Sequence, residues 1–422
     1  MPSLVINPNG TLPRAWLVVG VLWVVAALNY LDRNMVTTMR YSLNEVIPMS
    51  EQQFGWVTTS FLWMYGVLSP VGGFLADRFN RSRLIMVSLL VWSLLTWLTG
   101  HVKTYEQLIL VRALMGVSEA AYIPAALALI ADYHRGSTRS LAAGVHMIGI
   151  SVGSLLGGYG GWISEKFGWS FPFNVCGIFG VAYAGVLLLT LRDVPREQVE
   201  TTDGSPTAAQ PHVLEAISAL MRNRSFLLLI GFWSLLAVAG WALVGWLPVY
   251  FKEKFHLTQG IAGIYATNFL FAAAFFGKLV SGVWADWWSR TNPRGRILVP
   301  VIGLCLAGPS IAIVAGSPVL YLALVGLSIY GFTRTFSDTN LMPILCQVVD
   351  PRYRATGYGF LNMFATIIGG ITILLGGVIR DAKVSVGYLF AGSAVGLLLC
   401  AGLLFLVKPT VKEVQGPKSN DE

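Results

Sequence analysis

Long apolar stretches separated by short polar segments recur along the whole chain. Many of them are about 17–25 residues long, which is the length of an α-helix that crosses a bilayer. The first stretch runs on into charged residues without a small-residue cleavage site, so we interpret it as an uncleaved helix and not as a signal peptide. The pattern predicts an all-α polytopic membrane protein with twelve transmembrane helices, near residues 15–38, 54–76, 84–101, 106–131, 138–164, 170–190, 226–251, 259–286, 297–316, 318–347, 355–379 and 385–407.

The longest polar interruption, residues 192–212, divides the predicted helices into six and six. It has no aromatic residue and is rich in Pro, Thr and acidic residues, which is typical of a linker. The next segment, "VLEAISALMRNR", places its apolar residues on one helical face and predicts a helix on the membrane surface. We expect an N-terminal six-helix bundle (1–191), a cytoplasmic linker with this amphipathic helix (192–224), a C-terminal six-helix bundle (225–408) and a cytoplasmic tail (409–422).

Composition and charge agree with this class. The chain is 55% hydrophobic and 12% charged, against about 25% charged residues in soluble domains. Its net charge of +8 does not indicate nucleic-acid binding, because the loops on the side of the two termini hold more than twice as many Arg and Lys as the opposite loops. By the positive-inside rule both termini are cytoplasmic, in a multi-pass protein of the cell inner (plasma) membrane.

The two halves repeat each other. "GGFLADRFNRSRLI" follows the second predicted helix, and "SGVWADWWSRTNPRGRIL" follows the eighth. Gly73 and Gly282 are separated by the same number of residues as Asp77 and Asp286. Parallel repeats of this kind are typical of alternating-access transporters, whose substrate site lies between the halves near the bilayer midplane.

The first copy of this loop resembles the loop motif of the major facilitator superfamily, through Gly73, Asp77, Arg78, Arg81 and Arg83. Its degenerate second copy contains Asp286 and Arg290. Within the superfamily, "NYLDR" and "RALMGVSEAAYIPA" resemble the anion:cation symporters, and "DPRYRATGYG" is similar to the Spinster-like carriers. The resemblance implies the major facilitator fold and a conformational latch formed by Gly73, Asp77, Arg78, Arg81, Asp286 and Arg290.

The first predicted helix carries two adjacent charges, Asp32 and Arg33. A charge inside the membrane costs at least about 2.5–3.5 kcal/mol on insertion scales, so it is normally paired and functional. Adjacent helical residues point about 100° apart and need partners from another helix. In the fourth predicted helix Arg112, Gly116 and Glu119 share one face, which supplies those partners.

The same resemblance implies that Asp32 and Glu119 carry protons and that Arg33 binds the anion. Arg112, on the same helical face as Glu119, is a further candidate for substrate contact. Static ion pairs that lock the two helices together are the alternative, for Arg112 above all. Structural ion-pair networks and functional sites are not distinguished by such patterns alone.

The second half supplies further candidates for substrate contact. Arg334 and Asp338 stand at i and i+4 in the tenth predicted helix, with Asn340 close by; the alternative is an intrahelical ion pair. Lys278 either faces the cavity or snorkels to the surface. The remaining candidate hydrogen-bonding residues are Tyr30, Tyr65, Tyr122, Asn268 and Asn362.

The sequence predicts a secondary transporter that imports a small organic anion, such as a sugar acid, together with protons. Phosphate-binding loops, metal-ligand spacings and nucleophile motifs are absent from the sequence, so we expect no enzyme activity and no cofactor beyond the proton gradient. The open alternatives are a Spinster-like lysolipid carrier, a receptor without transport, a neutral-sugar transporter and sodium coupling. Expected partners are the anionic substrate and membrane lipid, without nucleic acid, in a monomer.

Overall fold

The computed structural model describes residues 14–134, 138–193, 213–350 and 353–409. In these ranges the chain forms α-helices and no strand. The helices are α1 (Ala15–Thr38), α2 (Arg40–Val46), α3 (Glu51–Arg78), α4 (Arg81–Thr99), α5 (Tyr105–Glu119), α6 (Tyr122–Tyr133), α7 (Arg139–Gly157), α8 (Gly160–Phe167), α9 (Ser170–Thr190), α10 (Val213–Arg222), α11 (Arg224–Lys254), α12 (Gln259–Ser289), α13 (Gly295–Gly316), α14 (Leu320–Val348), α15 (Arg354–Asp381) and α16 (Gly387–Leu406).

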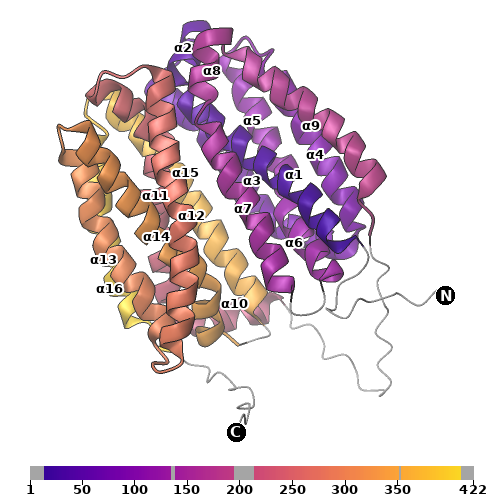
Figure 1. Cartoon of the computed structure of the whole chain (residues 1–422), viewed down its shortest axis with the longest axis vertical. Helices are drawn as coiled ribbons and strands as arrows, with labels where there is room; N and C mark the ends of the chain where they lie inside the picture. Colours follow the sequence, from indigo (N-terminus) through magenta and orange to yellow (C-terminus); the bar gives the residue numbers. More distant parts are fainter. Residues whose placement is uncertain (1–13, 135–137, 194–212, 351–352, 410–422) are drawn as a thin grey trace.

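Twelve long segments match the predicted transmembrane helices. Eleven of them are long and apolar enough to cross a membrane, with α5 and α6 forming one span and α7 and α8 another. The twelfth is α14, a 29-residue helix whose middle is polar. Figure 1 shows the first six spans, in indigo to magenta, beside the last six, in rose and orange to yellow. The predicted all-α architecture with two halves is therefore confirmed.

A row of glycines joins α1 to α7. Gly149, Gly153 and Gly157 recur every four residues on one face of α7, and a Cβ atom added to Gly153 would lie 2.0 Å from the carbonyl oxygen of Ala27. Small residues at this spacing let two helix backbones approach closely. The glycines of α7 thus allow this helix to pack closely against α1.

The two ends of the molecule differ in how the halves meet. We call the end where α1 begins and α16 ends the terminal end, and the end with α2 and α8 the distal end (Figure 1). Hydrogen bonds between the halves are dense at the distal end, and they continue inward through Trp63, whose indole N–H donates to the Ile367 carbonyl at 3.1 Å. The halves are therefore joined from the distal end to about mid-membrane.

The predicted amphipathic helix after the linker is present as α10. Leu220 is buried, and the Tyr353 hydroxyl donates to Glu215 at 3.0 Å, so α10 is attached to the second half. Residues 194–212 of the linker and 410–422 of the tail lie outside the described residues. The exact domain boundaries stay a prediction.

Candidate functional site

A buried ion pair connects α1 to α5. Arg33 Nε donates to Glu119 Oε2 at 2.9 Å, and Arg33 Nη2 lies 2.8 Å from the same oxygen. Asn29, one turn before Arg33, donates to this oxygen at 2.8 Å. The Arg33 and Glu119 side chains are 7% and 0% exposed. The predicted contact between the charges of the first and fourth spans is therefore present, with Glu119 as the partner of Arg33.

The local sequence explains the position of Glu119. It is the last residue of α5, and the helix is interrupted before α6 begins at Tyr122. Pro124 lacks an N–H and its ring crowds the carbonyl of Ala120 four residues earlier, which favours a break of the helix at this point. Glycines in contact with this region, Gly72 and Gly116, let α3 approach closely: a Cβ at Gly116 would lie 2.4 Å from the Phe61 carbonyl oxygen. Gly116, which shares a helical face with Arg112 and Glu119, thus makes room for α3.

The other two charges of the cluster lack a close ionic partner among the described residues. Asp32 accepts a hydrogen bond from the Thr96 hydroxyl at 2.9 Å, and its second oxygen has no partner there. Arg112 contacts the sulphur of Met115 at 3.8 Å, and its Nε is unpartnered within the same part of the chain. Buried polar groups normally have hydrogen-bond partners. Within the described residues, Asp32 and Arg112 each keep one polar atom without such a partner.

Aromatic rings enclose the guanidinium of Arg33. Its Cζ lies 4.3 Å from the ring centroid of Tyr65, 4.7 Å from that of Tyr30 and 4.9 Å from that of Phe61. The same Phe61 ring lies 4.9 Å from Arg112 Cζ. Cation–π contacts of this kind stabilise a desolvated cation by about 2 kcal/mol. The predicted residues Tyr30 and Tyr65 are thus part of the site, together with Phe61.

The second half brings a second charged group to the same region. Arg334 Nη1 lies 2.8 Å from Asp338 Oδ2, and both side chains are about a quarter exposed, at 24% and 26%. This is the intrahelical pair that the sequence allowed as the alternative. Lys278 donates to the hydroxyl of Ser151 on α7 at 3.3 Å. It therefore faces the opposite half and does not snorkel to the surface.

Glu119 and Arg334 lie at corresponding depths. Glu119 is the middle residue of the 29-residue span Tyr105–Tyr133, and Arg334 is the middle residue of the 29-residue α14. Each is about 21 Å from either end of its span at 1.5 Å per residue. The charged groups of the two halves are therefore both near the middle of their spans.

Other predicted residues lie apart from this group. Tyr122 is fully buried, and its hydroxyl donates to the Leu22 carbonyl at 2.9 Å. Asn340 is buried against α12, where it donates to Ser281 at 2.9 Å. Asn268 donates to the Tyr159 hydroxyl at 3.2 Å across the two halves. Asn362 is half-buried on α15. The Tyr122 hydroxyl and the Asn340 amide are therefore both used in hydrogen bonds within their own halves.

The loop motif of the first half joins helices within that half. Arg81 donates to the Asp132 carboxylate at the end of α6, and its Nε donates to the Ala76 carbonyl at 3.2 Å. Gly73 has open space beside it, and Arg78 is exposed. The side chain of Asp77 lies outside the described residues.

The second copy of the motif makes a weaker contact. Asp286 lies 3.3 Å from Arg296, and Asp286 is largely exposed. Arg290 is exposed. The partner of Asp286 is thus an arginine that the comparison of the two loops did not single out. The latch role of both copies stays a prediction.

The distal end is closed by a network of charges between the halves. Arg380 of α15 donates to both oxygens of Glu253 at 2.7 Å and to Glu51 of α3 at 3.1 Å. Arg40 donates to Glu51 at 3.0 Å. Asp381 accepts the N–H groups at the start of α3, each at 2.9 Å. These bonds hold α3, α11 and α15 together at this end.

Two residues of the α2 and α12 ends complete this closure. The Gln259 side-chain oxygen accepts the N–H of Tyr41 at 2.8 Å, and the Tyr41 hydroxyl donates to Glu253 at 2.7 Å. Burial, together with the bond to Glu253, raises the pKa of the Tyr41 hydroxyl. Tyr41 therefore stays protonated and continues to donate at neutral pH.

Several residues of the site were not predicted from the sequence. Asn29 carried a signal, because it lies four residues before Arg33 on the same helical face. Thr96 and Phe61 carried none, since their roles depend on how α3 and α4 pack against α1. Arg380 and Glu253 were not predicted as partners, because their network with Glu51 forms only where the two halves meet.

Comparison with known proteins identifies the family. The model of the Major Facilitator Superfamily matches residues 22–373. The chain belongs to the major facilitator superfamily. It is therefore a multi-pass membrane transporter and not an enzyme.

Similar members of the superfamily include Spinster proteins. Protein spinster homolog 1 of Bos taurus is 30% identical over 91% of this chain and 78% of its own length. An MFS-type efflux pump of Mycolicibacterium smegmatis is 27% identical over 92% of this chain and 90% of its own. The sphingosine-1-phosphate transporter SPNS2 of Xenopus tropicalis is 26% identical over 83% and 70%. The Spinster-like features of the sequence are thus confirmed.

A solved structure shares the fold. It is a bacterial homolog of the human lysosomal transporter Spinster, in an inward-facing and unoccupied conformation. It superposes with a TM-score of 0.76 at 22% identity, covering 94% of this chain and 97% of its own. This similarity supports the fold of two six-helix halves.

Proposed function

We propose that this protein is a proton-coupled secondary transporter of an amphiphilic organic anion that works by alternating access. The observation that carries the proposal is the buried cluster of Asp32, Arg33 and Glu119, in which one acid is paired and the other is not. A buried unpaired charge is costly, so Asp32 is the group that gains most from binding a proton.

The cluster supplies a route for coupling. Glu119 neutralises Arg33 in this conformation. A proton on Glu119 would free the Arg33 guanidinium to bind an anionic headgroup, and departure of the anion would return Arg33 to the carboxylate. Because a carboxylate and an anion compete for one guanidinium, proton binding to Glu119 favours anion binding to Arg33, and the reverse holds by linkage.

The surroundings of Arg33 favour an amphiphile over a fully polar solute. Tyr30, Phe61 and Tyr65 surround the guanidinium with aromatic surface, which suits the apolar part of a substrate whose acidic group binds Arg33. The similarity to Spinster proteins and to a sphingosine-1-phosphate transporter supports a single-chain lipid with an anionic headgroup.

Symport of a small organic anion, such as a sugar acid, is the second candidate. The observation that favours it is the number of cationic groups near mid-membrane: Lys278 of the second half contacts Ser151 of the first, and Arg334 is a further cation in the second half. Two or more cations on opposite walls suit a compact anion with several oxygens.

The proposed orientation follows the distribution of basic residues. With both termini in the cytoplasm of a cell inner membrane, the distal end faces outward. The closed distal network then corresponds to a carrier whose cavity is accessible from the cytoplasm.

Transport by purified protein in liposomes with a trapped pH dye tests the proposal. The added substrates are a lysophospholipid, a sphingoid-base phosphate, sugar acids and a neutral sugar. The variants are Asp32→Asn and Glu119→Gln, with the exposed carboxylate variant Glu45→Gln as a matched control. We expect an anionic amphiphile to move protons in the wild type and in Glu45→Gln, and both site variants to lose this flux.

Two results would contradict the proposal. If sugar acids move protons and amphiphiles do not, the second candidate replaces the first. If an amphiphile is transported equally by all four proteins without a proton flux, the Asp32–Glu119 cluster has a structural role only.

A further inference from the structure

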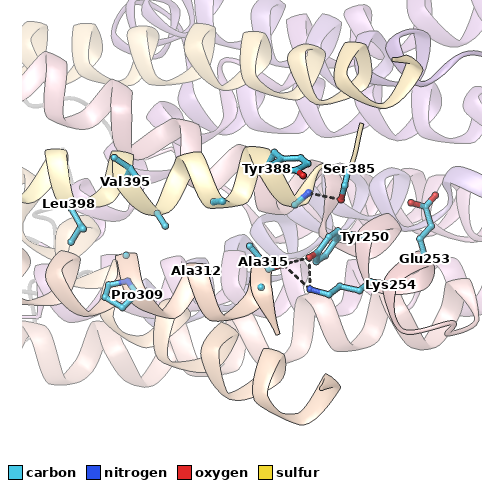
Figure 2. Close-up of a pocket in the computed structure, with 15 residues that line it drawn as sticks. Tyr250, Glu253, Lys254, Pro309, Ala312, Ala315, Ser385, Tyr388, Val395 and Leu398 are labelled. Atoms are coloured by element: carbon cyan, nitrogen blue, oxygen red, sulfur yellow. Dashed lines mark hydrogen bonds between the residues drawn. The ribbon is translucent and has the colours of Figure 1, made fainter. Parts of the chain in front are cut away.

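A groove separate from the central charges runs along the outside of the second half. It lies between α13 and α16 at the distal end of α11 and encloses about 830 Å³. Ligand pockets are typically about 300–1,000 Å³. Figure 2 shows Pro309, Ala312, Val395 and Leu398 along its walls, and Tyr250, Lys254 and Glu253 at one end.

Small residues form the groove. On α13 and α16 its lining includes Gly308, Ala312, Gly316, Gly387 and Ala391. A Cβ atom added to Gly316 would meet no atom within 4 Å. A Cβ atom added to Gly308 would instead lie 3.0 Å from the Ala394 carbonyl oxygen. The two helices therefore touch at Gly308, and the small residues leave a groove on their surface.

One end of the groove carries Lys254, a cation that has no ionic partner among the described residues. The ring centroids of Tyr250 and Phe255 lie 5.0 and 5.6 Å from its Nζ. Lys254 Nζ donates to the Tyr250 hydroxyl at 2.7 Å and to the Ala315 carbonyl at 2.8 Å. Neither partner is negatively charged. The nearby carboxylate of Glu253 is already bound by two N–H groups of Arg380. A lysine ammonium has three donors, so the third donor and the charge of Lys254 remain for a ligand.

The length of the groove matches one leaflet. Its lining on α16 extends from Gly387 to Leu398, which is about 16 Å at 1.5 Å per residue. The hydrocarbon core of a bilayer is about 30 Å thick, so the groove covers half of it. Its polar end lies at the distal ends of α11, α13 and α16, where lipid headgroups are expected.

We propose that this groove binds a phospholipid with a net negative headgroup from the leaflet at the distal end. One acyl chain lies along the small residues of α13 and α16, and the phosphate lies against Lys254. The site does not depend on the proposed function, because its residues are outside the central cluster and its ligand is a membrane lipid.

Native mass spectrometry of the full chain in detergent tests the proposal. Phosphatidylglycerol and phosphatidylcholine with identical acyl chains are added, and the bound lipids are counted. We expect the wild type to retain phosphatidylglycerol about tenfold more strongly than phosphatidylcholine, as for one charge-assisted hydrogen bond. Lys254→Gln should lose this preference, and Lys254→Arg should keep it.

Two further variants separate the headgroup from the chain. Ala391→Leu fills the groove and should weaken retention of both lipids, whereas Ala182→Leu, an equivalent exposed change on α9, should not. Lys166→Gln, on α8 of the first half at the same end, is the charge control for Lys254→Gln. The measured thermal midpoint confirms that each variant is folded.

Three results would overturn the proposal. The first is equal retention of the two lipids by the wild type. The second is a Lys254→Gln variant that retains phosphatidylglycerol as the wild type does. The third is an Ala391→Leu variant that changes the dimer population and not the bound lipid, because a second copy of the chain would then be the occupant.

Discussion

The Arg33–Glu119 pair shows what one buried contact contributes at the scale of residues. Both side chains are nearly inaccessible to solvent. Removing one partner of a buried ion pair leaves an uncompensated charge, which costs about 3–5 kcal/mol, whereas removing both costs much less. The pair is therefore more informative when its members are changed together than when one is changed alone.

Glu119→Gln should lower the stability of the folded protein by about 3–5 kcal/mol, because Arg33 loses its carboxylate. The double variant Arg33→Gln/Glu119→Gln should recover most of this loss. Thermal unfolding of each variant in detergent gives a midpoint temperature, and the differences between these midpoints measure the change in stability. Equal stability of the single and double variants would show that the pair is not coupled.

The sequence was informative about the residues of this cluster and uninformative about their partners. Asp32, Arg33 and Glu119 were found because charges are rare within apolar spans. Thr96 and Phe61 were missed, since Thr and Phe are ordinary residues of a membrane helix and only packing places them beside Asp32 and Arg112.

At the scale of helices, the glycine row on α7 determines how closely α1 packs. A side chain at Gly153 would overlap the Ala27 carbonyl, whereas a Cβ atom added to Gly144 on the same helix would meet no atom within 4 Å. The close contact between α1 and α7 therefore requires a glycine at position 153 and not at position 144.

Gly153→Leu should therefore separate α1 from α7 and reduce the yield of folded protein severalfold, whereas Gly144→Leu should have little effect. Size-exclusion chromatography of both variants after identical expression measures the folded fraction. A normal elution profile for Gly153→Leu would contradict the packing described for α1 and α7.

Most helices could be predicted from the sequence, because their apolar stretches have the length of a bilayer. The interruptions were not predicted. The fourth span breaks at Ala120 and Ala121 before Pro124, and the fifth breaks at Gly158 and Tyr159. An apolar pattern continues through both breaks, so hydropathy alone does not reveal them.

At the scale of the whole molecule, the distal network joins the two halves at one end. Arg380 joins Glu51 of the first half to Glu253 of the second. Hydrogen bonds to charged groups contribute about 1.5–3 kcal/mol, and about 1.4 kcal/mol is a tenfold change in an equilibrium constant. Loss of this side chain should therefore shift the balance between the two access states.

Arg380→Gln is expected to raise the population that is open at the distal end at least about tenfold. Spin labels at positions 45 and 383, in a variant whose four cysteines are replaced, measure the distance across this end. Lys103→Gln, an exposed lysine variant at the same end, is the control. An unchanged distance distribution in Arg380→Gln would show that the network does not hold the end closed.

The repeat of the two halves was predictable from the loop motifs, and the state of the molecule was not. Arg380, Glu51 and Glu253 lie far apart in the sequence and meet only when the halves close at one end. The same chain must lose these contacts when it opens there, so no single sequence pattern specifies them.

Uphill transport and exchange in proteoliposomes, compared in the same protein, separate proton coupling from substrate binding. A labelled anionic amphiphile is followed first with a pH gradient as the driving force and then with unlabelled substrate on the opposite side. We predict that Asp32→Asn loses accumulation driven by the pH gradient but keeps exchange, because the protein still alternates and Arg33 still binds the anion. Gradient-driven accumulation by Asp32→Asn at the wild-type level would contradict the proposal that Asp32, together with Glu119, takes part in proton coupling.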